Sequence, residues 1–486
     1  MSSNAGLSPQ GQADYERTTA GGRLVSRVVD GVSQIYTAAV SAMILALFAP
    51  LVALTSRKVE RGLLAVVLLN LPLQIAKHFF IREDAEDMGS IGGLEVSLSN
   101  LALGGLYLAW FLRTPRIVPP QRRNRIQISV PAVLFLLFNV LSLFVAPDAT
   151  LCAFEVWIVL ELFLLFVFVA NTVTSRDDVL FIVRLLLVGL VFEDVLMLGQ
   201  AAGLIGDINV WGIRAKAAFL ESSRISGTIG APNSAASYLG MLMAMAVGVL
   251  LAKVGRMDKY LAAAALAMGT IPLIFTLSRG GWLGFLVSLA TIAVFGSSVR
   301  HVSWKALAAA AVIVLLSLPF AGAISDRLSA DDNGAARARM PLNEIAGQMI
   351  EDHPILGVGA NNFPLAMEPY ITHGFIGEFL YTVHNKYLLV WAEAGTGAAI
   401  AFVWFLLATI RQGTRCWKLR DPLFAPIALG CLAAMAGHMT QMFVDTFRGG
   451  PQNHLLWLFG GIIAVMTRIS APPPRGLSGI RESRIA

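Results

Sequence analysis

Long apolar stretches separated by short polar turns run along almost the whole chain. Each stretch is close to the roughly 20 residues that a helix needs to cross a hydrocarbon core about 30 Å thick. The pattern predicts an all-α fold, a polytopic membrane bundle of about 12 transmembrane helices with a large periplasmic loop between late helices. The apolar stretches are residues 35–54, 63–80, 94–112, 128–146, 152–173, 179–204, 234–252, 261–277, 282–298, 306–324, 387–410, 423–443 and 454–467.

The charges between the stretches indicate the orientation. Several arginines fall within residues 113–125, and a loop of this kind is expected on the cytoplasmic side. Counting back from that loop places the basic turn 57–61 in the cytoplasm, yet the basic N-terminal tail is expected there as well. Stretch 35–54 therefore either crosses the membrane once, against this tendency, or forms a broken hairpin. We favour an even number of spans with both ends inside.

This alternation divides the chain into five parts. We expect a cytoplasmic N-terminal tail, a transmembrane bundle, a large periplasmic loop, the last transmembrane helices and a cytoplasmic C-terminal tail. Their boundaries are residues 1–32, 33–325, 326–384, 385–468 and 469–486.

The composition agrees with a membrane protein. Apolar residues make up 56% of the chain, charged residues 14%, and the mean hydropathy is +0.68. These values lie outside the range of soluble globular proteins. The net charge of +6 is spread over short loops and both ends, so it predicts no nucleic-acid partner. Cys152, Cys416 and Cys431 lie in or beside apolar stretches without a CxxC pattern and are expected to be small core residues.

The polar stretch 326–384 is the large loop. Within it, apolar residues of 341–351 recur at helical spacing and predict an amphipathic helix that rests on the membrane or on the bundle. His353 and Pro354 are expected to stop this helix. Gly357 and Gly359 then predict a turn where the backbone can approach another group closely.

Three residues from distant stretches are the main candidates for chemistry. Arg279 precedes two glycines, which would let a phosphate approach its guanidinium, although an arginine at a membrane boundary can also simply mark the interface. Arg224 falls in an external loop and could equally be a solvated arginine. His384 could act as a general base because imidazole titrates near neutral pH, but a lone histidine at a helix boundary is more often structural.

Charges inside the apolar stretches are a second group of candidates, because each costs about 3 kcal/mol unless it is paired or hydrated. Arg184 could pair with Glu193 or Asp194, or these residues could line a water-filled cavity. The sequence has no GxxxxGK, HExxH or GxSxG motif, so we expect no metal and no cofactor. The intramembrane candidates are Glu155, Glu161, Arg184, Glu193, Asp194 and Glu393.

Four stretches, in one order, resemble the O-antigen polymerase and O-antigen ligase superfamily. They are RISGTIGAPN (224–233), SRGGW (278–282), HPILGVGANNF (353–363) and HNKYLLVWAEAG (384–395). With the hydropathy profile, the resemblance covers about residues 35–468 and leaves both tails outside.

The resemblance implies a multi-pass protein of the bacterial inner membrane. It further implies an inverting glycosyltransferase that moves a glycan from undecaprenyl pyrophosphate at the periplasmic face without a nucleotide sugar. Arg224 and Arg279 would hold the pyrophosphate, and His384 would position or deprotonate the acceptor hydroxyl. Its partners would be the undecaprenyl-pyrophosphate-linked oligosaccharide and membrane lipids, and a chain-length regulator is left open. The further expected substrate contacts are Asn233, Arg339, Gly357, Gly359 and Asn385.

Three functions remain open at this point. We favour a polymerase of O-antigen or exopolysaccharide repeat units. A ligase that transfers the glycan to lipid A core or protein shares the same donor chemistry. A polysaccharide transporter or flippase would use Glu161, Asp194 and Glu393 as a proton relay, but transporters usually show paired internal repeats, and none is evident here.

Overall fold

The computed structural model describes most of the chain, and the account below is limited to that part. The described residues are 56–113, 127–205, 208–210, 213–215, 224–296, 315–329, 335–371 and 381–471, although the side chains of 112, 113, 208–215, 323 and 335–338 are not described. The chain divides into two compact units, residues 1–63 with 104–117 and residues 64–103 with 118–486. The described part of the first unit, residues 56–63 and 104–113, is almost entirely helical.

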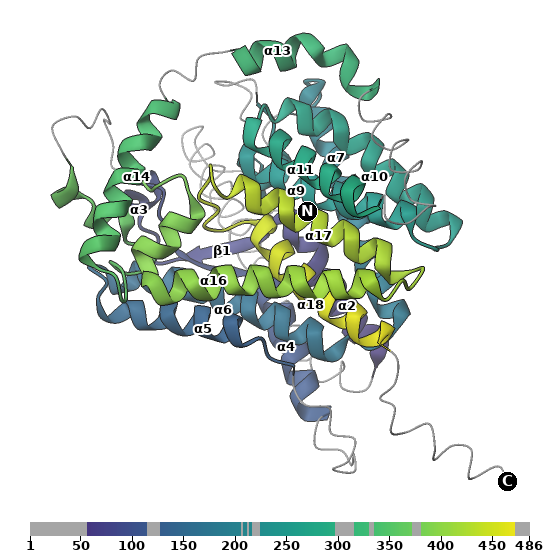
Figure 1. Cartoon of the computed structure of the whole chain (residues 1–486), viewed down its shortest axis with the longest axis horizontal. Helices are drawn as coiled ribbons and strands as arrows, with labels where there is room; N and C mark the ends of the chain where they lie inside the picture. Colours follow the sequence, from purple (N-terminus) through teal and green to yellow (C-terminus); the bar gives the residue numbers. More distant parts are fainter. Residues whose placement is uncertain are drawn as a thin grey trace, which may run out of the picture. The chain divides into compact units, whose positions relative to one another are not determined.

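Helices dominate the described residues (Figure 1), so the predicted all-α class is confirmed. The N-terminal half of the described chain contains α2 (Arg57–Leu73), α3 (Glu83–Asp87), α4 (Leu98–Arg113), α5 (Val130–Leu141), α6 (Ala149–Thr172), α7 (Arg176–Ala201) and α9 (Pro232–Leu251). The C-terminal half contains α10 (Arg256–Phe275), α11 (Arg279–Gly296), α13 (Ala321–Ser329), α14 (Ala335–Asp352), α15 (Phe363–Ala366), α16 (Lys386–Lys418), α17 (Phe424–Gln441) and α18 (Pro451–Ser470).

Five described helices are long and apolar enough to cross a membrane, namely α6, α9, α10, α11 and α16. The chain is therefore described below as a multi-pass membrane protein. The expected count of about 12 spans stays a prediction, since the first apolar stretch, 35–54, lies outside the described residues and 306–324 is described only from residue 315.

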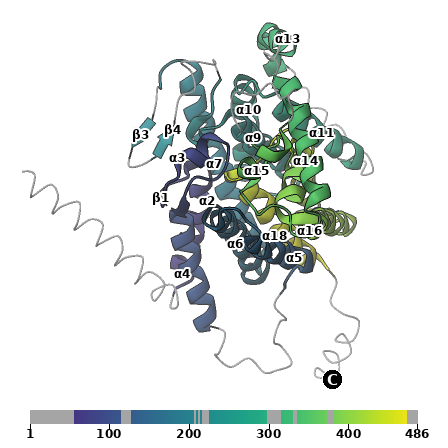
Figure 2. The same ribbon diagram turned by 90° about the vertical axis from the view of Figure 1, so that its left-hand side faces the viewer.

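Two predicted spans, 63–80 and 94–112, differ from the structure, because each includes a β-strand. The stretch 63–80 was expected to be one helix, but α2 ends at Leu73, where Gln74 adopts a left-handed φ of 47°. The chain then forms strand β1 (Ala76–Phe79), which pairs antiparallel with β2 (Leu94–Ser97) before α4 begins. Polar residues favour this ribbon, because His78 lies directly opposite Glu95 across the pair. A second ribbon joins β3 (Ile208–Val210) to β4 (Ile213–Ala215), and Figure 2 shows these two short strands side by side.

Small residues allow the central helices of the second unit to pack closely. α17 packs against α9 and α11. A Cβ atom on Gly248 of α9 would lie 2.6 Å from the carbonyl oxygen of Pro426, and one on Gly284 of α11 would lie 2.8 Å from that of Gly437. Contacts of this kind let helix backbones approach in an apolar solvent, where burial alone does not drive association.

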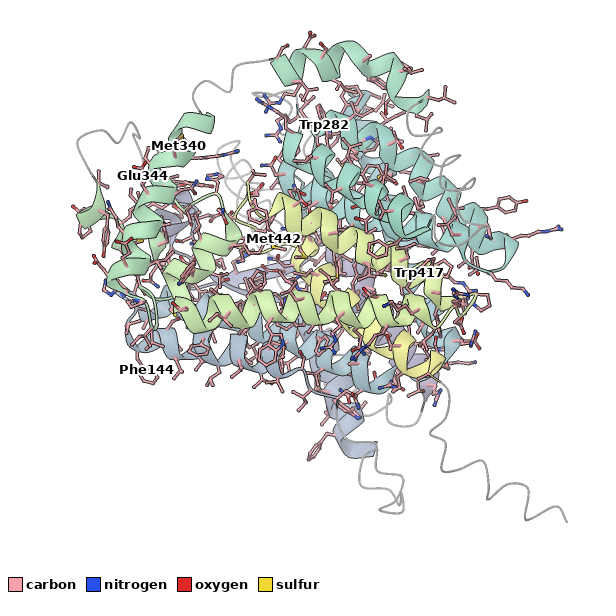
Figure 3. All side chains as sticks on the ribbon, in the orientation of Figure 1. Phe144, Trp282, Met340, Glu344, Trp417 and Met442 are labelled. Carbon is pink, nitrogen blue, oxygen red and sulfur yellow. The ribbon has the colours of Figure 1, made fainter. Side chains whose placement is uncertain are left out.

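The amphipathic helix of the large loop is confirmed as α14, which covers the predicted 341–351 and ends at Asp352. Its apolar face packs on the start of α16, where Leu342, Ile345 and Met349 share a buried cluster with Leu389. Phe144 and Glu344 lie toward one end of the long helices, and Trp417 lies at the other end (Figure 3).

The predicted pairing of Arg184 with Glu193 or Asp194 is wrong. Arg184 instead reaches across to α10, where its Nε and Nη2 donate to the two carboxylate oxygens of Asp258 at 2.6 and 3.0 Å. Glu193 and Asp194 lie about two to three helical turns further along α7 from Arg184, which is beyond the reach of a pair between neighbouring turns.

Candidate functional site

The loop before α9 holds Arg224 in a fixed position. Its Nε donates to the carbonyl oxygen of Thr276 at 2.8 Å, and its Nη2 donates to Oδ1 of Asn233 at 2.7 Å. Thr276 precedes Arg279 by three residues, so this contact brings the two candidate arginine segments together.

Arg279 is the first residue of α11, and the two glycines after it lie against protein. A Cβ atom on Gly280 would lie 3.0 Å from Cγ2 of Val444, and one on Gly281 would lie 2.4 Å from Cβ of Ala236. The glycines therefore let the start of α11 approach α9 and the loop after α17. This close packing is enough to explain the two glycines, without the expected need for space for a phosphate.

Asp445 connects the arginine segments to the histidine and was not among the predicted site residues. Its carboxylate interacts with the Asn233 side chain and electrostatically with His384 and Arg339. The same loop is tied to α9 by Gln441, whose Nε2 donates to the carbonyl oxygen of Asn233 at 3.0 Å. Burial raises the pKa of Asp445 above its ordinary value, although these neighbours oppose the shift.

His384 lies immediately before α16 and is half-buried. Its ring stacks on Tyr381 with the centroids 5.3 Å apart, and its buried Nδ1 has no hydrogen-bond partner among the described residues. Burial lowers the pKa of His384, the Asp445 carboxylate raises it, and the Arg339 guanidinium lowers it. The net lowering favours the neutral imidazole near pH 7, which is the form that can accept a proton.

The structure thus brings together most of the predicted site residues, although they come from distant parts of the sequence. We call Arg224, Asn233, Arg279, Arg339, His384 and Asp445 the polar cluster, in which Arg279 is included because it begins the helix whose first turn packs on Val444, the residue before Asp445. The sequence placed Asp445 in an external turn but offered no spacing or motif that marked it. Its only signal was an acidic residue on the side of the membrane expected to carry the arginines and the histidine.

Asn385, a predicted substrate contact, has a structural task. It is the N-cap of α16, and its Oδ1 accepts from the backbone N–H groups of Tyr387 and Leu388 at 3.0 and 3.1 Å. This capping explains an asparagine before the helix without any ligand.

Gly357 and Gly359, the other predicted contacts, approach protein backbone. α16 breaks at Gly395, which has φ 80°, and the freed carbonyl oxygens of Ala392 and Glu393 accept from the N–H groups of Val358 and Gly359, both at 2.9 Å. A Cβ atom on Gly357 would lie 2.4 Å from the carbonyl carbon of Glu393. Their expected role in substrate binding gains no support from this geometry, because the group that approaches them is the broken helix.

The asparagines that follow complete this attachment. Asn361 Nδ2 donates to the carbonyl oxygens of Ile91 and Leu151, and Asn362 Nδ2 donates to that of Asp148. We call residues 353–363 the glycine segment. It fastens the large loop to α16, to the turn before α6 and to the loop before β2.

A buried ion-pair network lies beneath the polar cluster. Arg448 donates from Nη2 and Nη1 to the two carboxylate oxygens of Glu393 at 2.6 and 2.9 Å, and from Nη2 to the Thr382 hydroxyl at 3.0 Å. Lys386 lies 3.7 Å from Glu155. Two acids and two bases neutralise one another here, which allows four charged side chains to be buried. The sequence identified Glu155 and Glu393 as costly charges but did not identify their partners.

An apolar cavity of about 1030 Å³ begins beside this region and follows α16. Its near end is formed by Tyr387, Thr440 and Phe443, and its far end by Leu407 and Ile410. The rings of Tyr387 and Phe443 lie 4.6 Å apart, and the Tyr387 hydroxyl donates to the carbonyl oxygen of Met439. Residues 387 to 410 of a helix rise about 35 Å, which is comparable to the thickness of a hydrocarbon core.

Among the described residues, no group of three or more His, Cys, Asp or Glu side chains is placed to hold a metal ion. The polar cluster instead offers guanidinium, imidazole, amide and carboxylate groups at one end of the long helices. The fold and this cluster together define a multi-pass helical membrane protein with a polar site at one end of its long helices.

Comparison with known proteins is more specific. Residues 262–403 match the family model described as O-antigen ligase, which confirms the resemblance to the O-antigen polymerase and ligase superfamily over that part of the chain. The matched range includes Arg279, Arg339 and His384, whereas Arg224, Asn233 and Asp445 lie outside it. A search of curated proteins finds no match to this chain.

Proposed function

We propose that this protein is an inverting glycosyltransferase that moves a glycan from a lipid diphosphate to an acceptor hydroxyl at the periplasmic face of the inner membrane. The observation that carries the proposal is that Arg224 donates to Asn233, beside the loop of Asp445, and that the charge of Asp445 acts on His384, so that an anion-binding group and a proton acceptor lie in one region. The O-antigen ligase match supports the reaction class.

The arginines would bind the diphosphate. A guanidinium keeps its charge at every relevant pH and can bind two phosphate oxygens at once. Arg224 is oriented by Thr276 and Asn233, so little ordering remains when the donor binds. As the glycosyl bond breaks, the leaving diphosphate gains negative charge, which fixed guanidinium groups stabilise more than they stabilise the intact donor.

His384 would serve as the general base. The acceptor oxygen attacks the anomeric carbon from the face opposite the diphosphate, and the bond between that carbon and the phosphate oxygen breaks. The acceptor proton passes to the imidazole, and the electron pair of the broken bond leaves with the lipid diphosphate. One displacement of this kind inverts the anomeric configuration. Asp445 would stabilise the imidazolium that forms, because its charge raises the pKa of His384.

The apolar cavity along α16 would accept the lipid chain of the donor. It starts at Tyr387, two residues after the N-cap Asn385, and at Phe443, two residues before Asp445. From there it extends along α16 for about the thickness of a hydrocarbon core. The diphosphate of the donor would then bind at Arg224 and Arg279 while its lipid chain lies in this cavity. No further apolar site would be needed for the donor.

Two acceptors fit this chemistry. We favour a second lipid-linked repeat unit, which makes the protein a polymerase. A ligase that transfers the glycan to lipid A core or protein is favoured by the description of the matching family. The transporter hypothesis requires a shared relay, yet Glu161 contacts His454, Glu393 contacts Arg448, and Asp194 lies beside Glu193, so these acids occupy separate surroundings.

The test is electrophoresis of surface polysaccharide from a deletion strain and from the strain restored with the wild-type chain. A polymerase predicts loss of long chains while single repeat units remain on the anchor. A ligase predicts an anchor with no glycan attached. Unchanged polysaccharide in the deletion strain contradicts both forms of the proposal.

A further inference from the structure

Glu193 has no part in the reaction proposed above, yet it holds the loop that carries Arg224. This residue of α7 is fully buried, with 0% of its surface exposed. Its Oε1 accepts from the backbone N–H of Thr228 at 2.6 Å, and its Oε2 lies 2.6 Å from the Thr228 hydroxyl. About two helical turns further along α7, Oε1 of Gln200 accepts from the N–H of Gly227 at 2.9 Å. Two side chains of α7 thus hold the short turn Gly227–Ile229.

The hydrogen bonds around Thr228 favour a protonated Glu193. The Thr228 hydroxyl also lies 2.8 Å from the carbonyl oxygen of Pro72. A carbonyl oxygen can only accept, and a hydroxyl carries one proton. When that proton goes to Pro72, the contact between Thr228 Oγ1 and Glu193 Oε2 requires a proton from the carboxyl group.

The surroundings of Glu193 favour the same state. Asp194 is also fully buried, and the arginine of this helix, Arg184, is paired with Asp258. Among the residues that the structure describes, Glu193 has no cationic partner, and a buried carboxylate of this kind is strongly disfavoured, so the group binds a proton instead.

We propose that Glu193 is a neutral carboxylic acid that positions the Arg224 loop for donor binding. The N–H of Thr228 donates to Oε1 of Glu193. The carboxyl O–H of Glu193 donates to the Thr228 hydroxyl, which in turn donates to the carbonyl oxygen of Pro72. This assignment of a positioning residue rests on the proposed function for its effect on catalysis, whereas the protonation state stands on the hydrogen bonds alone.

The backbone of the Arg224 loop lies in direct contact with Glu193 at Gly227. Gly227 has φ 59°, and a Cβ atom there would lie 1.7 Å from Oε1 of Glu193. The backbone of the loop therefore rests directly on the carboxyl group. Arg224, three residues before Gly227, then reaches Thr276 and Asn233. Loss of the carboxyl would free the turn and displace the guanidinium from the polar cluster.

The experiment compares Glu193→Gln with Glu193→Ala in purified protein supplied with a lipid-diphosphate-linked oligosaccharide. Glutamine reproduces the neutral acid, because its oxygen can accept from Thr228 N–H and its amide can donate to the hydroxyl. We expect Glu193→Gln to retain transfer close to the wild-type rate and Glu193→Ala to lose about 100-fold, the scale of a displaced reacting group. Asp194→Asn, the neighbouring buried acid, is the matched control and should retain transfer. Elution as a single species in size-exclusion chromatography checks folding.

Infrared spectroscopy provides a measurement that does not depend on transfer. At neutral pH the carbonyl stretch of protonated carboxyl groups in the wild-type protein should include a contribution that Glu193→Gln loses and Asp194→Asn keeps. A spectrum in which Glu193→Gln loses no such contribution, or a Glu193→Gln variant as inactive as Glu193→Ala while folded, overturns the inference. If Arg279→Ala transfers glycan as the wild type does, the proposed function fails, and the spectrum still decides the state of Glu193.

Discussion

The polar cluster and the glycine segment were both expected to contact substrate, and the structure gives them different surroundings. In the polar cluster, side chains from distant stretches act on one another, since Arg224 donates to Asn233 and the charge of Asp445 acts on His384. In the glycine segment, backbone N–H groups bind the freed carbonyl oxygens of α16, and two asparagines bind backbone elsewhere. The polar cluster brings together guanidinium, amide, imidazole and carboxylate groups, whereas the glycine segment makes hydrogen bonds that join one part of the backbone to another.

This difference shows that a glycine-rich motif indicates close approach but does not say what approaches. A broken helix exposes carbonyl oxygens that a membrane protein must satisfy internally. The N–H groups of Val358 and Gly359 satisfy these oxygens, and the carbonyl oxygen of Pro354 accepts from the freed N–H of Thr396. The stretches around Gly357 and Gly395 therefore belong together for a structural reason.

The largest expected effect is the loss of a charged member of the polar cluster. Arg279→Ala and His384→Ala should each lower glycan transfer by about 100- to 1,000-fold, the cost of removing one group that stabilises developing charge. Polysaccharide electrophoresis and immunoblots of membranes measure transfer and protein level. Arg176→Ala is the control, because this exposed arginine pairs with Asp421 at the far end of α7. Equal transfer by all three variants contradicts the role of the cluster.

Changes in the glycine segment should act on folding. Gly357→Ala or Gly395→Ala would force a Cβ atom to 2.4 Å from Glu393 or 2.0 Å from Ile355, at a backbone φ that disfavours alanine. We expect the free energy of unfolding to fall by about 1–3 kcal/mol or more. The melting temperature in detergent measures this, with Gly347→Ala as control, since its Cβ would meet nothing within 4 Å. A variant with normal stability and no transfer would instead restore the substrate-binding interpretation.

Filling the apolar cavity should separate donors by chain length. Ala399→Trp would occupy the cavity. The KM for a long-chain donor should rise about tenfold, the scale of a few lost apolar contacts, while the KM for a short-chain donor stays unchanged. Leu283→Trp, at an exposed position of α11 outside the cavity, is the control. An equal effect of Ala399→Trp on both donors would remove the lipid chain from this cavity.

The pH dependence of transfer should reveal the two charges that act on His384. The base must be neutral, so the rate falls on the acid side as pH drops through the pKa of His384, which burial lowers from its ordinary value of 6.5. Asp445 raises this pKa, so Asp445→Asn should move the acid limb to lower pH. Arg339 lowers it, so Arg339→Gln should move the limb to higher pH. Shifts in the same direction would contradict the arrangement.

The smallest effect is expected at the rim of the glycine segment. Arg82 is exposed and pairs with Asp148 and Asp84. Exposed ion pairs contribute little because solvent screens them. Arg82→Ala should leave both the melting temperature and transfer unchanged, and a marked loss of either would mean that the segment depends on this pair.

The sequence was sufficient for features that repeat or stand out locally. Apolar stretches predicted the all-α membrane fold, helical spacing predicted α14, and motif order predicted the resemblance that residues 262–403 confirm. Features that depend on distant contacts were not predictable. The β1–β2 ribbon, the partner of Arg184, the task of Gly357, and the place of Asp445 are each set by a segment far away in sequence.

The most direct test of the proposed reaction follows single-turnover transfer by the purified protein in liposomes that contain a lipid-diphosphate-linked oligosaccharide. The wild-type protein should release lipid diphosphate and form a longer or acceptor-linked glycan with inverted anomeric configuration, and Arg224→Ala, Arg279→Ala and His384→Ala should not. Equal release by the wild type and all three variants, or a product with retained configuration, would contradict the account.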